Sequence, residues 1–494
     1  MKIKNLIVTF LIVVSYGCAT NPVTGDQDLV LMSEKDEIEL GKKVNQETLR
    51  EYSVYNDLEL QNYVQYVGKK VAAKSHRPNL DYTFTVVDSP EVNAFALPGG
   101  YVYITRGLMG YLNTEGELAA VLGHEIGHVT ARHAVRQQSL TQLTGIGAAI
   151  GSIIGEAFIP GISSAGGQEL VGIAGTAMLR GYGRDQELEA DKLGAEYLAR
   201  SGYDPDAMLE VIGILKNQEL FEIKLAREEK RAPRIYHGVF STHPDSDTRL
   251  QEVVGPARAI KEASKEATFV GRTEYLQRVD GLVYGENTDQ GLIKGRDFYH
   301  GDMGFAMRFP QAWVIQNLPD RLMAGSANGT AKIQVMVQGA DPRLDPKAYM
   351  EKHMGLASVT NGQALTINGL PAYSGTAVLN TDAGKRLTRI TVIYLQRAAF
   401  ILVGWTQDPN GLGIYNNAFM EASRSFRPLT PAERDVATRS NRIKVLRADE
   451  NTSFGSLAAA SSLEKFQEQQ LRLINGLYPA GEIKSGELIK EVQN

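Results

Sequence analysis

The sequence predicts an α+β protein with several cores, a mainly helical one first and a sheet-rich one after it. With 494 residues, the chain exceeds the size of one compact domain. Apolar residues recur at helical spacing through much of the first half, whereas residues 285–430 carry runs that alternate like strands. The formal net charge is only −5, so no global field favours nucleic acid, and we expect no nucleic-acid partner.

The N-terminal stretch "MKIKNLIVTFLIVVSYGCAT" reads as an export signal, with two lysines before a short apolar run. Cys18 is the only cysteine, which excludes an intramolecular disulfide framework. The end of this stretch resembles a bacterial lipobox, although Ser15 stands where such motifs usually carry leucine. The resemblance implies that residues 1–18 are a signal peptide and that Cys18 is lipidated. It also implies a periplasmic lipoprotein on the outer membrane, with simple cleavage or an uncleaved anchor as the alternative.

The next elements are predicted as two helices, two strands and a long helix. Ser33 suits the N-cap of a helix over roughly Glu34 to Tyr52, and another helix is expected from Leu58 to Lys74. Alternating side chains predict strands in "DYTFTVVD" and "GGYVYITRGL", on either side of "NAFALP". A helical pattern then runs from Glu115 to about Leu140.

Two histidines on this long helix have the spacing of metal ligands. In "VLGHEIGHVTARH", His124 and His128 lie one turn apart on one face, and Glu125 is displaced from them. The spacing suits zinc because two imidazoles must converge on one ion, and the glutamate can then reach the metal's water. A solvated helix face is the alternative. Apolar residues between the polar ones favour burial, where unpaired polar groups are costly.

A catalytic zinc ion needs a third protein ligand. In the downstream cluster "RDQELEAD", Glu187 and Asp191 share a helix face and Glu189 points elsewhere. Glu187 as the ligand and Asp191 as the acceptor from a ligand histidine is the economical assignment, and an acidic solvated face is the alternative. His133, five residues past His128, would lie well around a continuous helix from it. The histidines expected to be structural are His76, His133, His237, His300 and His353.

The pair HExxH and ExEAD is similar to the gluzincin zinc metallopeptidases of the HtpX, CAAX prenyl endopeptidase and BepA-like family. "NPVTG", "NAFALPGGYVYITRGL", "HEIGHVTARH" and "RDQELEADKLG" occur in the family's order. The resemblance implies a mainly helical zincin-type peptidase domain with a small sheet over residues 19–260. It further implies one zinc ion per chain, with Glu187 as the third ligand.

The resemblance also assigns further site residues. "NAFA" looks like the family's edge strand, along which an extended substrate pairs, and a plain core strand is the alternative. Its residues are Asn93, Ala94, Phe95 and Ala96. In "FSTHPDSDTRL", His243 resembles a family histidine that stabilises the transition state or inhibits as a fourth ligand; a satisfied loop histidine is the alternative. Arg249 is a weaker candidate for an oxyanion or carboxylate contact, against a structural ion pair.

This ligand set predicts peptide hydrolysis. Zinc held by His124, His128 and Glu187 lowers the pKa of its water from about 15.7 to roughly 7 and polarises a peptide carbonyl. Glu125 takes the proton and returns it to the leaving amine. The predicted function is a cell-envelope endopeptidase that acts on misfolded or unassembled envelope proteins. The alternative is an envelope chaperone or assembly factor whose peptidase site is latent.

Three further segments complete the predicted organisation. The glycine-rich apolar stretch from Leu143 to Tyr182 is expected to form packed helices beside the cleft, with a mobile gate as the alternative. Residues 285–430 are predicted as an antiparallel sheet backed by helices, a binding or scaffolding domain that faintly resembles PsbP-like domains. Residues 440–494 resemble a LysM-type βααβ module. Because Glu450-Asn451-Thr452 replaces that family's usual Gly-Asp-Thr, peptidoglycan tethering and an interaction module without glycan binding both stay open.

Overall fold

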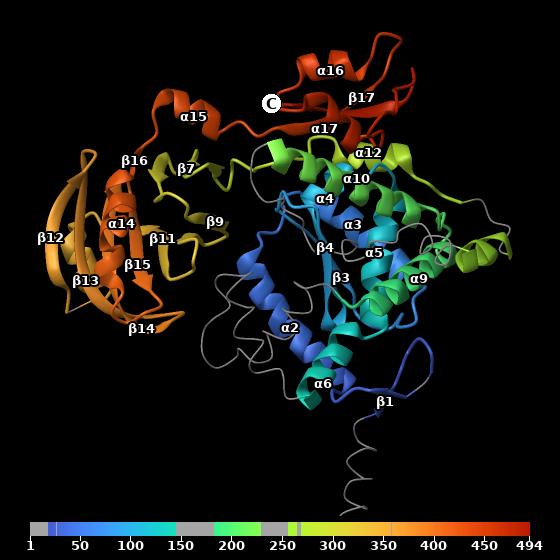
Figure 1. Cartoon of the computed structure of the whole chain (residues 1–494), viewed down its shortest axis with the longest axis horizontal. Helices are drawn as coiled ribbons and strands as arrows, with labels where there is room; N and C mark the ends of the chain where they lie inside the picture. Colours follow the sequence, from blue (N-terminus) through green and yellow to red (C-terminus); the bar gives the residue numbers. More distant parts are fainter. Residues whose placement is uncertain (1–17, 26, 145–181, 229–254, 264–267, 357) are drawn as a thin grey trace, which may run out of the picture.

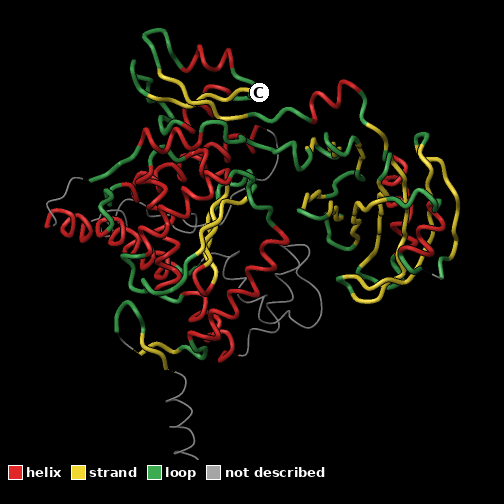
Figure 2. Tube along the Cα trace, turned by 180° about the vertical axis from the view of Figure 1, so that it is seen from behind, coloured by secondary structure: helices red, strands yellow, loops and turns green. Residues whose placement is uncertain are grey.

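The computed structural model describes residues 18–25, 27–144, 182–228, 255–263, 268–356 and 358–494. Figure 1 shows three parts: a helical unit (residues 27–284), a sheet unit (residues 285–430) at the opposite end of the long axis, and a C-terminal module (residues 441–494) against the helical unit. Figure 2 shows the same division from behind, with strands concentrated in the sheet unit. The sequence expectation of an α+β chain is confirmed at this level.

The helical unit begins with two helices close to their expected bounds. Helix α2 spans Glu34–Glu51, and the Ser33 side chain accepts the backbone N–H of Asp36, as expected for an N-cap. Helix α3 spans Leu58–Ala72 and is capped in the same way by Asp57. A short hairpin of β1 (Cys18–Thr20) and β2 (Gln27–Leu29) precedes both helices.

A three-stranded sheet lies beside these helices. Strand β3 (Thr83–Val87) pairs in parallel with β5 (Tyr101–Thr105), which pairs antiparallel with β4 (Ala94–Leu97). The order β3-β5-β4 puts β4 at an edge. The segment "NAFALP" therefore contains a third strand between the two predicted ones. Helix α4 (Arg106–Tyr111) follows the sheet directly.

The long helix predicted from Glu115 to about Leu140 is broken, so that prediction is wrong in its continuity. Helix α5 spans Glu115–Thr130 and α6 spans His133–Thr144. Between them Arg132 has a φ of 55°, a left-handed conformation that ends α5. The Arg132 guanidinium donates to Glu37 of α2 at 2.7 Å and to the carbonyl of Met32 at 3.0 Å. These tertiary contacts hold the chain in a conformation that local periodicity does not indicate.

The remaining helices of this unit are α9 (Arg184–Arg200), α10 (Ala207–Glu228) and α12 (Arg272–Val279). One apolar cluster joins α3, α5, α9, α10, α12 and the inner face of the small sheet. It includes Tyr275, Leu276 and Val279 of α12, so this core reaches past residue 260, where the sequence suggested the domain boundary. Of the helices that the structure describes, none combines the length and apolar character needed to cross a membrane.

The sheet unit contains a seven-stranded antiparallel sheet in the order β12-β13-β14-β15-β11-β10-β9. The strands are β9 (Val314–Leu318), β10 (Arg321–Gly325), β11 (Ala331–Gly339), β12 (Thr360–Ile367), β13 (Leu370–Thr381), β14 (Gly384–Leu395) and β15 (Ala398–Thr406). Along β15, Phe400 and Leu402 pack in the cluster that holds Phe419 of α14 (Leu412–Ser425), and Ile401 packs in the cluster that holds Tyr349. The sheet therefore has an apolar core on each face, as alternating side chains require.

Shorter elements complete the sheet unit. A four-stranded sheet has the order β16-β8-β7-β6. Its strands are β6 (Leu292–Lys294), β7 (Asp297–His300), β8 (Phe305–Arg308) and β16 (Arg427–Pro428). The helices are α13 (Pro346–Ala348), η2 (Tyr349–His353) and α15 (Pro431–Ala437).

The C-terminal module has the expected order of a strand, two helices and a strand. Its elements are β17 (Arg442–Arg447), α16 (Phe454–Ala460), α17 (Gln467–Ile474) and β18 (Leu488–Gln493). The backbone N–H of Ile443 donates to the Leu282 carbonyl at 2.8 Å. Nζ of Lys490, which is fully buried, donates to the carbonyls of Gly110 and Leu112 at 2.8 and 2.7 Å. The module is therefore packed into the helical unit next to α4 (Figure 1).

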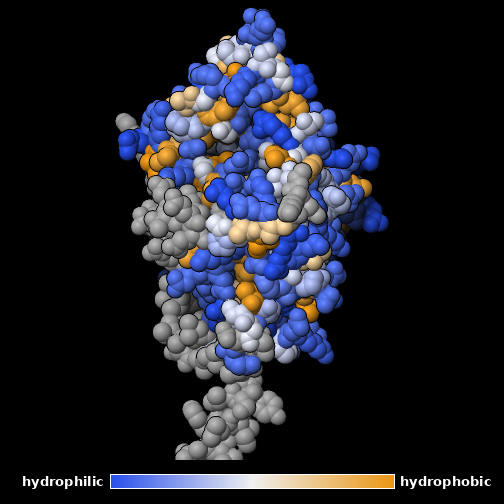
Figure 3. All heavy atoms as spheres, turned by 90° about the vertical axis from the view of Figure 1, so that its right-hand side faces the viewer, coloured by the Kyte–Doolittle hydropathy of each residue, from blue (hydrophilic) through white to orange (hydrophobic). Residues whose placement is uncertain are grey.

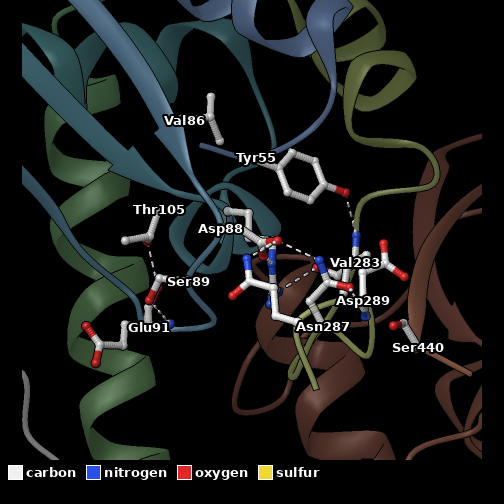
Figure 4. A network of polar contacts seen from close by, with 12 residues as sticks. Tyr55, Val86, Asp88, Ser89, Glu91, Thr105, Val283, Asn287, Asp289 and Ser440 are labelled. Atoms are coloured by element: carbon white, nitrogen blue, oxygen red, sulfur yellow. Dashed lines mark hydrogen bonds and ion pairs between the residues drawn. The ribbon is translucent and has the colours of Figure 1, made fainter. Parts of the chain in front are cut away.

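A polar network fixes the exit from the helical unit toward the sheet unit (Figure 4). Asp88, directly after β3, accepts from Arg106 Nε at 2.5 Å, from Asn287 Nδ2 at 2.5 Å and from Gln290 Nε2 at 2.7 Å. A buried carboxylate with three donors is well compensated. The face seen in Figure 3 is mainly hydrophilic, with hydrophobic residues in small separate patches.

Candidate metal centre

The candidate site forms where α5 crosses α9 over small residues. A Cβ atom on Gly127 would lie 2.8 Å from the carbonyl oxygen of Ala190, and one on Gly194 would lie 2.9 Å from the backbone nitrogen of His124. A larger side chain at either position would push the two helices apart. The sequence analysis missed this contact. Its signal in the sequence is the spacing of small residues, since Gly123 and Gly127 are four residues apart, as are Ala190 and Gly194.

This contact brings together the three predicted metal ligands. One possible ligand atom each from His124, His128 and Glu187 lie within 4.8 Å of one another. The two Nε2 atoms are 2.9 Å apart, and the Glu187 carboxylate oxygens lie 3.5 Å from His124 Nε2 and 3.8 Å from His128 Nε2. All three side chains are buried. Two imidazoles and one carboxylate that converge in this way match the donor set of a catalytic zinc site.

Two buried carboxylate oxygens without hydrogen-bond partners show whether a cation fits between the candidate ligands. Among the described residues, Oε2 of Glu187 and Oε1 of Glu125 are buried without a hydrogen-bond partner. A buried carboxylate oxygen without a partner is costly, and a divalent cation between the carboxylate and the imidazoles compensates that cost. The residues present therefore fit a zinc ion.

Asp191 orients the first histidine. Its Oδ1 lies 2.7 Å from Nδ1 of His124, which leaves Nε2 of His124 facing His128 and Glu187. Burial lowers the pKa of His124, but the nearby carboxylates of Asp191 and Glu187 outweigh this effect and raise that pKa to about 10 without a metal. The predicted position of Asp191 behind a ligand histidine matches this geometry.

The second histidine has a different environment. Nδ1 of His128 lies 2.8 Å from Nδ1 of His133, and the Tyr182 ring stacks on His128 at 4.0 Å between centroids. Burial lowers the pKa of His128, with help from the neighbouring histidines. His133 was expected to lie away from His128 on a continuous helix, and that expectation is wrong because the break at Arg132 turns His133 back.

Glu125 lies on α5 next to the ligand histidine and is 2 % exposed. Burial raises the pKa of its carboxyl group to about 8, His124 lowers it and Glu187 raises it further. A carboxyl group whose pKa lies near neutrality can both accept and return a proton. Such a group next to a metal-ligand set is what proton transfer in hydrolysis requires.

The other predicted residues lie as follows. Ala94, Phe95 and Ala96 are buried in β4 at the edge of the small sheet, and Asn93 precedes the strand with its N–H donating to Thr105 Oγ1 at 3.1 Å. His243, Arg249, the signal segment before Cys18, His237 and nearly all of the stretch from Leu143 to Tyr182 lie outside the described residues. The structure therefore places β4 and leaves those other predictions as predictions.

Three of the histidines expected to be structural contact groups away from the ligands. His76 Nδ1 lies 2.8 Å from the Tyr197 hydroxyl. His300 belongs to β7, and His353 stacks on Tyr349 in the sheet unit. In the described part of the chain, these contacts agree with a structural role.

The buried HExxH helix and the acidic helix that crosses it define a site of the zinc metallopeptidase class. Residues 59–257 match the sequence model of Peptidase family M48, which supports the predicted class. The chain is 30% identical over 273 residues to "Beta-barrel assembly-enhancing protease" of Escherichia coli, covering 52% of this chain and 53% of that protein. It is 29% identical over 218 residues to "Mitochondrial metalloendopeptidase OMA1" of Arabidopsis thaliana, covering 43% and 39%. The chain thus spans about half the length of the first of these relatives.

Among solved structures, the cyanobacterial PsbP protein of Synechocystis matches with a TM-score of 0.22 and 11% identity. The match covers 29% of this chain and 98% of that protein. At this TM-score the likeness carries no argument, so the faint PsbP resemblance stays a prediction.

Proposed function

We propose that this protein is a zinc-dependent endopeptidase of the cell envelope that hydrolyses misfolded or unassembled envelope proteins. The observation that carries the proposal is the buried cluster of His124, His128 and Glu187 next to Glu125. The similarity to the Escherichia coli β-barrel assembly-enhancing protease supports the envelope substrate class.

The proposed mechanism assigns one task to each side chain. His124, His128 and Glu187 would hold the zinc, whose chemistry at such a site is to polarise a peptide carbonyl and to lower the pKa of the attacking water. Glu125 accepts the proton of that water on Oε1, the carboxylate atom that has no protein partner, and later delivers it to the leaving amine nitrogen. Asp191 holds the His124 ring by its Nδ1.

Substrate would bind in an extended conformation along β4. Among the described residues, strand β4 pairs only with β5 and so offers a backbone edge near α5. The proposed edge residues are Asn93, Ala94, Phe95 and Ala96. His243 and Arg249 are proposed to act on the oxyanion, or in the case of His243 to inhibit as an additional ligand. Measuring cleavage by His243→Ala separates these two roles, because the rate falls in the first case and rises in the second.

The proposed domain organisation follows the sequence. A signal peptide (1–18) precedes a peptidase domain (19–260), an accessory binding domain (285–430) and a LysM-like module (440–494). We propose peptidoglycan as a partner of that module. Pull-down of the chain with purified peptidoglycan sacculi, compared with a variant lacking residues 440–494 that has been shown to fold, tests this role. Equal retention of both proteins would exclude it.

The proposed location is the periplasm, where a lipid on Cys18 would attach the protein to the outer membrane. Metabolic labelling with a fatty-acid analogue should mark the wild-type protein and not Cys18→Ala. Membrane fractionation should move the variant into the soluble periplasmic fraction. An unlabelled wild-type protein would exclude the lipid anchor.

A direct test of the substrate class uses one protein in two states. The purified enzyme should cleave an unfolded outer-membrane β-barrel protein and leave the same protein intact once it is folded in detergent. If neither state is cleaved while aggregation of the unfolded state is suppressed, the peptidase proposal is replaced by the alternative, an envelope chaperone whose peptidase site is latent.

A further inference from the structure

The two imidazoles of the metal centre are supported by different neighbours. Behind His124 stands a carboxylate, Asp191, at 2.7 Å from Nδ1. Behind His128 stands another imidazole, His133, whose Nδ1 is 2.8 Å from Nδ1 of His128. The two rings meet edge to face, with centroids 5.0 Å apart. His133 is fully buried, so this contact is made away from solvent.

His133 is itself held on its far side. Its Nε2 lies 3.1 Å from Oε2 of Glu189, and the same oxygen accepts from Arg136 Nη1 at 3.2 Å. Arg136 also forms an ion pair with Asp28 of β2 at 3.4 Å. These contacts thus form a continuous series of side chains from the ligand candidate His128 through His133 to partly exposed charged groups.

When a metal is bound, only one placement of the ring protons gives every contact in this series one donor and one acceptor. The metal takes the lone pair on Nε2 of His128, so the ring proton of His128 sits on Nδ1 and must be donated. Nδ1 of His133 must then accept it, which puts the proton of the neutral His133 ring on Nε2. That N–H points at Glu189, a carboxylate that only accepts.

We propose that His133, oriented by Glu189, is a positioning residue that fixes the ring of His128 for metal binding. This inference rests on the proposed zinc site and extends it by a residue five positions after the HExxH motif. The local break at Arg132 is what makes the contact possible, because it starts a new helix at His133. Glu189, which the sequence placed on a different face from the ligands, acts through His133.

The test measures zinc affinity by competition with a chromophoric chelator. His133→Phe keeps a ring but removes the acceptor, and we expect zinc to bind about ten- to a hundred-fold more weakly. His133→Asn places an amide oxygen close to the position of Nδ1, and it should retain most of the affinity. His76→Phe is the matched control, because His76 lies in the same unit and contacts Tyr197 rather than a ligand. Its zinc affinity should equal that of the wild type.

Two results would overturn the proposal. One is a folded His133→Phe protein that binds zinc as tightly as the wild type. The other is equal weakening in His133→Phe and His133→Asn, which would assign the effect to ring packing. If His133→Phe does not fold, Glu189→Ala decides, since its side chain is partly exposed and its loss should weaken zinc binding by several-fold. Unchanged affinity in Glu189→Ala would then contradict the proposal.

A spectroscopic signature separates positioning from general stability. With cobalt(II) in place of zinc, the visible bands of folded His133→Phe should shift relative to those of His133→Asn and the wild type. Failure of the wild type to bind any metal would remove the zinc site and this inference together. Metal binding by the wild type with identical bands in all variants would remove this inference alone.

Discussion

The helical unit buries charged side chains throughout its core, whereas the sheet unit keeps nearly all of its charged side chains at the surface. Buried charged residues of the helical unit include Glu37, Arg77, Arg106, Glu115, Glu117, Glu125, Arg132, Glu187 and Asp191. Among the described residues of the sheet unit, Lys332 is the one buried Lys, Arg, Asp or Glu, and it is paired with Asp382 at 2.5 Å. Both units have apolar cores, but the polar groups buried in them differ.

The difference teaches where chemistry belongs in this chain. Burial of a charge is costly unless partners compensate it. A core that holds many charged residues therefore indicates that they have a specific structural or catalytic role. In the helical unit most of these residues have an ion-pair or hydrogen-bond partner, such as Arg77 with Glu37 at 2.8 Å, while Glu125 keeps an unpartnered oxygen. The apolar faces of the large sheet pack against α14 on one side and against the segment around Tyr349 on the other.

Metal removal should have the largest effect on stability. At zinc concentrations a thousand times the Kd, the ion stabilises the folded state by about 4 kcal/mol. Calorimetry with and without chelator should show the loss in the wild type. In Glu187→Gln, which lacks a charged ligand, the chelator should change the melting temperature little. An equal chelator effect in both proteins would break the link between the buried carboxylate and the metal.

The same experiment has a predicted pH dependence. In the metal-free protein the pKa of His124 is raised to about 10, so the stability that its proton contributes is fully present below its ordinary value of 6.5 and is lost as pH rises toward 10. The pKa of Glu125 is raised to about 8, so its contribution is lost between 4.5 and 8. Zinc needs a deprotonated histidine and binds better over the same window. The gap in melting temperature between zinc-loaded and metal-free protein should therefore be wider at pH 8 than at pH 6; a constant gap would contradict this.

Lys490 tests whether a buried polar side chain also holds the C-terminal module. Lys490→Met leaves the carbonyls of Gly110 and Leu112 without their donor, which should cost about 2 to 4 kcal/mol in urea unfolding. Lys444→Met, on the neighbouring strand β17 and largely exposed, should change stability by less than about 0.5 kcal/mol. Equal effects of the two substitutions would show that the module is not anchored by the hydrogen bonds of Lys490.

The crossing of α5 and α9 is expected to be the next most sensitive feature. Gly127→Ala puts a Cβ atom 2.8 Å from a backbone carbonyl of α9, which should destabilise by about 1 to 3 kcal/mol and weaken zinc binding. Gly213→Ala on α10 meets no atom within 4 Å and should be neutral or stabilising by up to about 1 kcal/mol. Zinc titration and urea unfolding of both variants check this, and a Gly127→Ala protein with wild-type zinc affinity would contradict the account of the crossing.

The smallest effect is expected at the surface of the sheet unit. Arg343 pairs with Asp341 at 2.8 Å, but its side chain is 85% exposed. Because solvent screens this exposed pair, Arg343→Ala should leave both the stability and the zinc content unchanged within experimental error. A clear loss of stability would show that surface charges of the sheet unit contribute to stability as the buried charges of the helical unit do.

The sequence predicted the elements whose local signals agree with their tertiary setting. Ser33 and the apolar spacing after it placed α2 within a residue or two, and the motif around His124 placed the ligand helix. The break at Arg132 escaped prediction because no glycine or proline marks it, and the ion pair with Glu37 that holds it spans 95 residues. The contact between His128 and His133 depends on that break, so periodicity alone could not show it.

The central claim is that the buried cluster on α5 and α9 is a zinc peptidase site in which Glu125 moves the proton. The most direct measurement combines elemental analysis for zinc with cleavage of an unfolded protein by wild type and Glu125→Gln. The account predicts one zinc ion per chain in both proteins and a loss of cleavage in the variant of at least about a hundred-fold. Wild-type protein without zinc, or equal cleavage by the two zinc-loaded proteins, would contradict it.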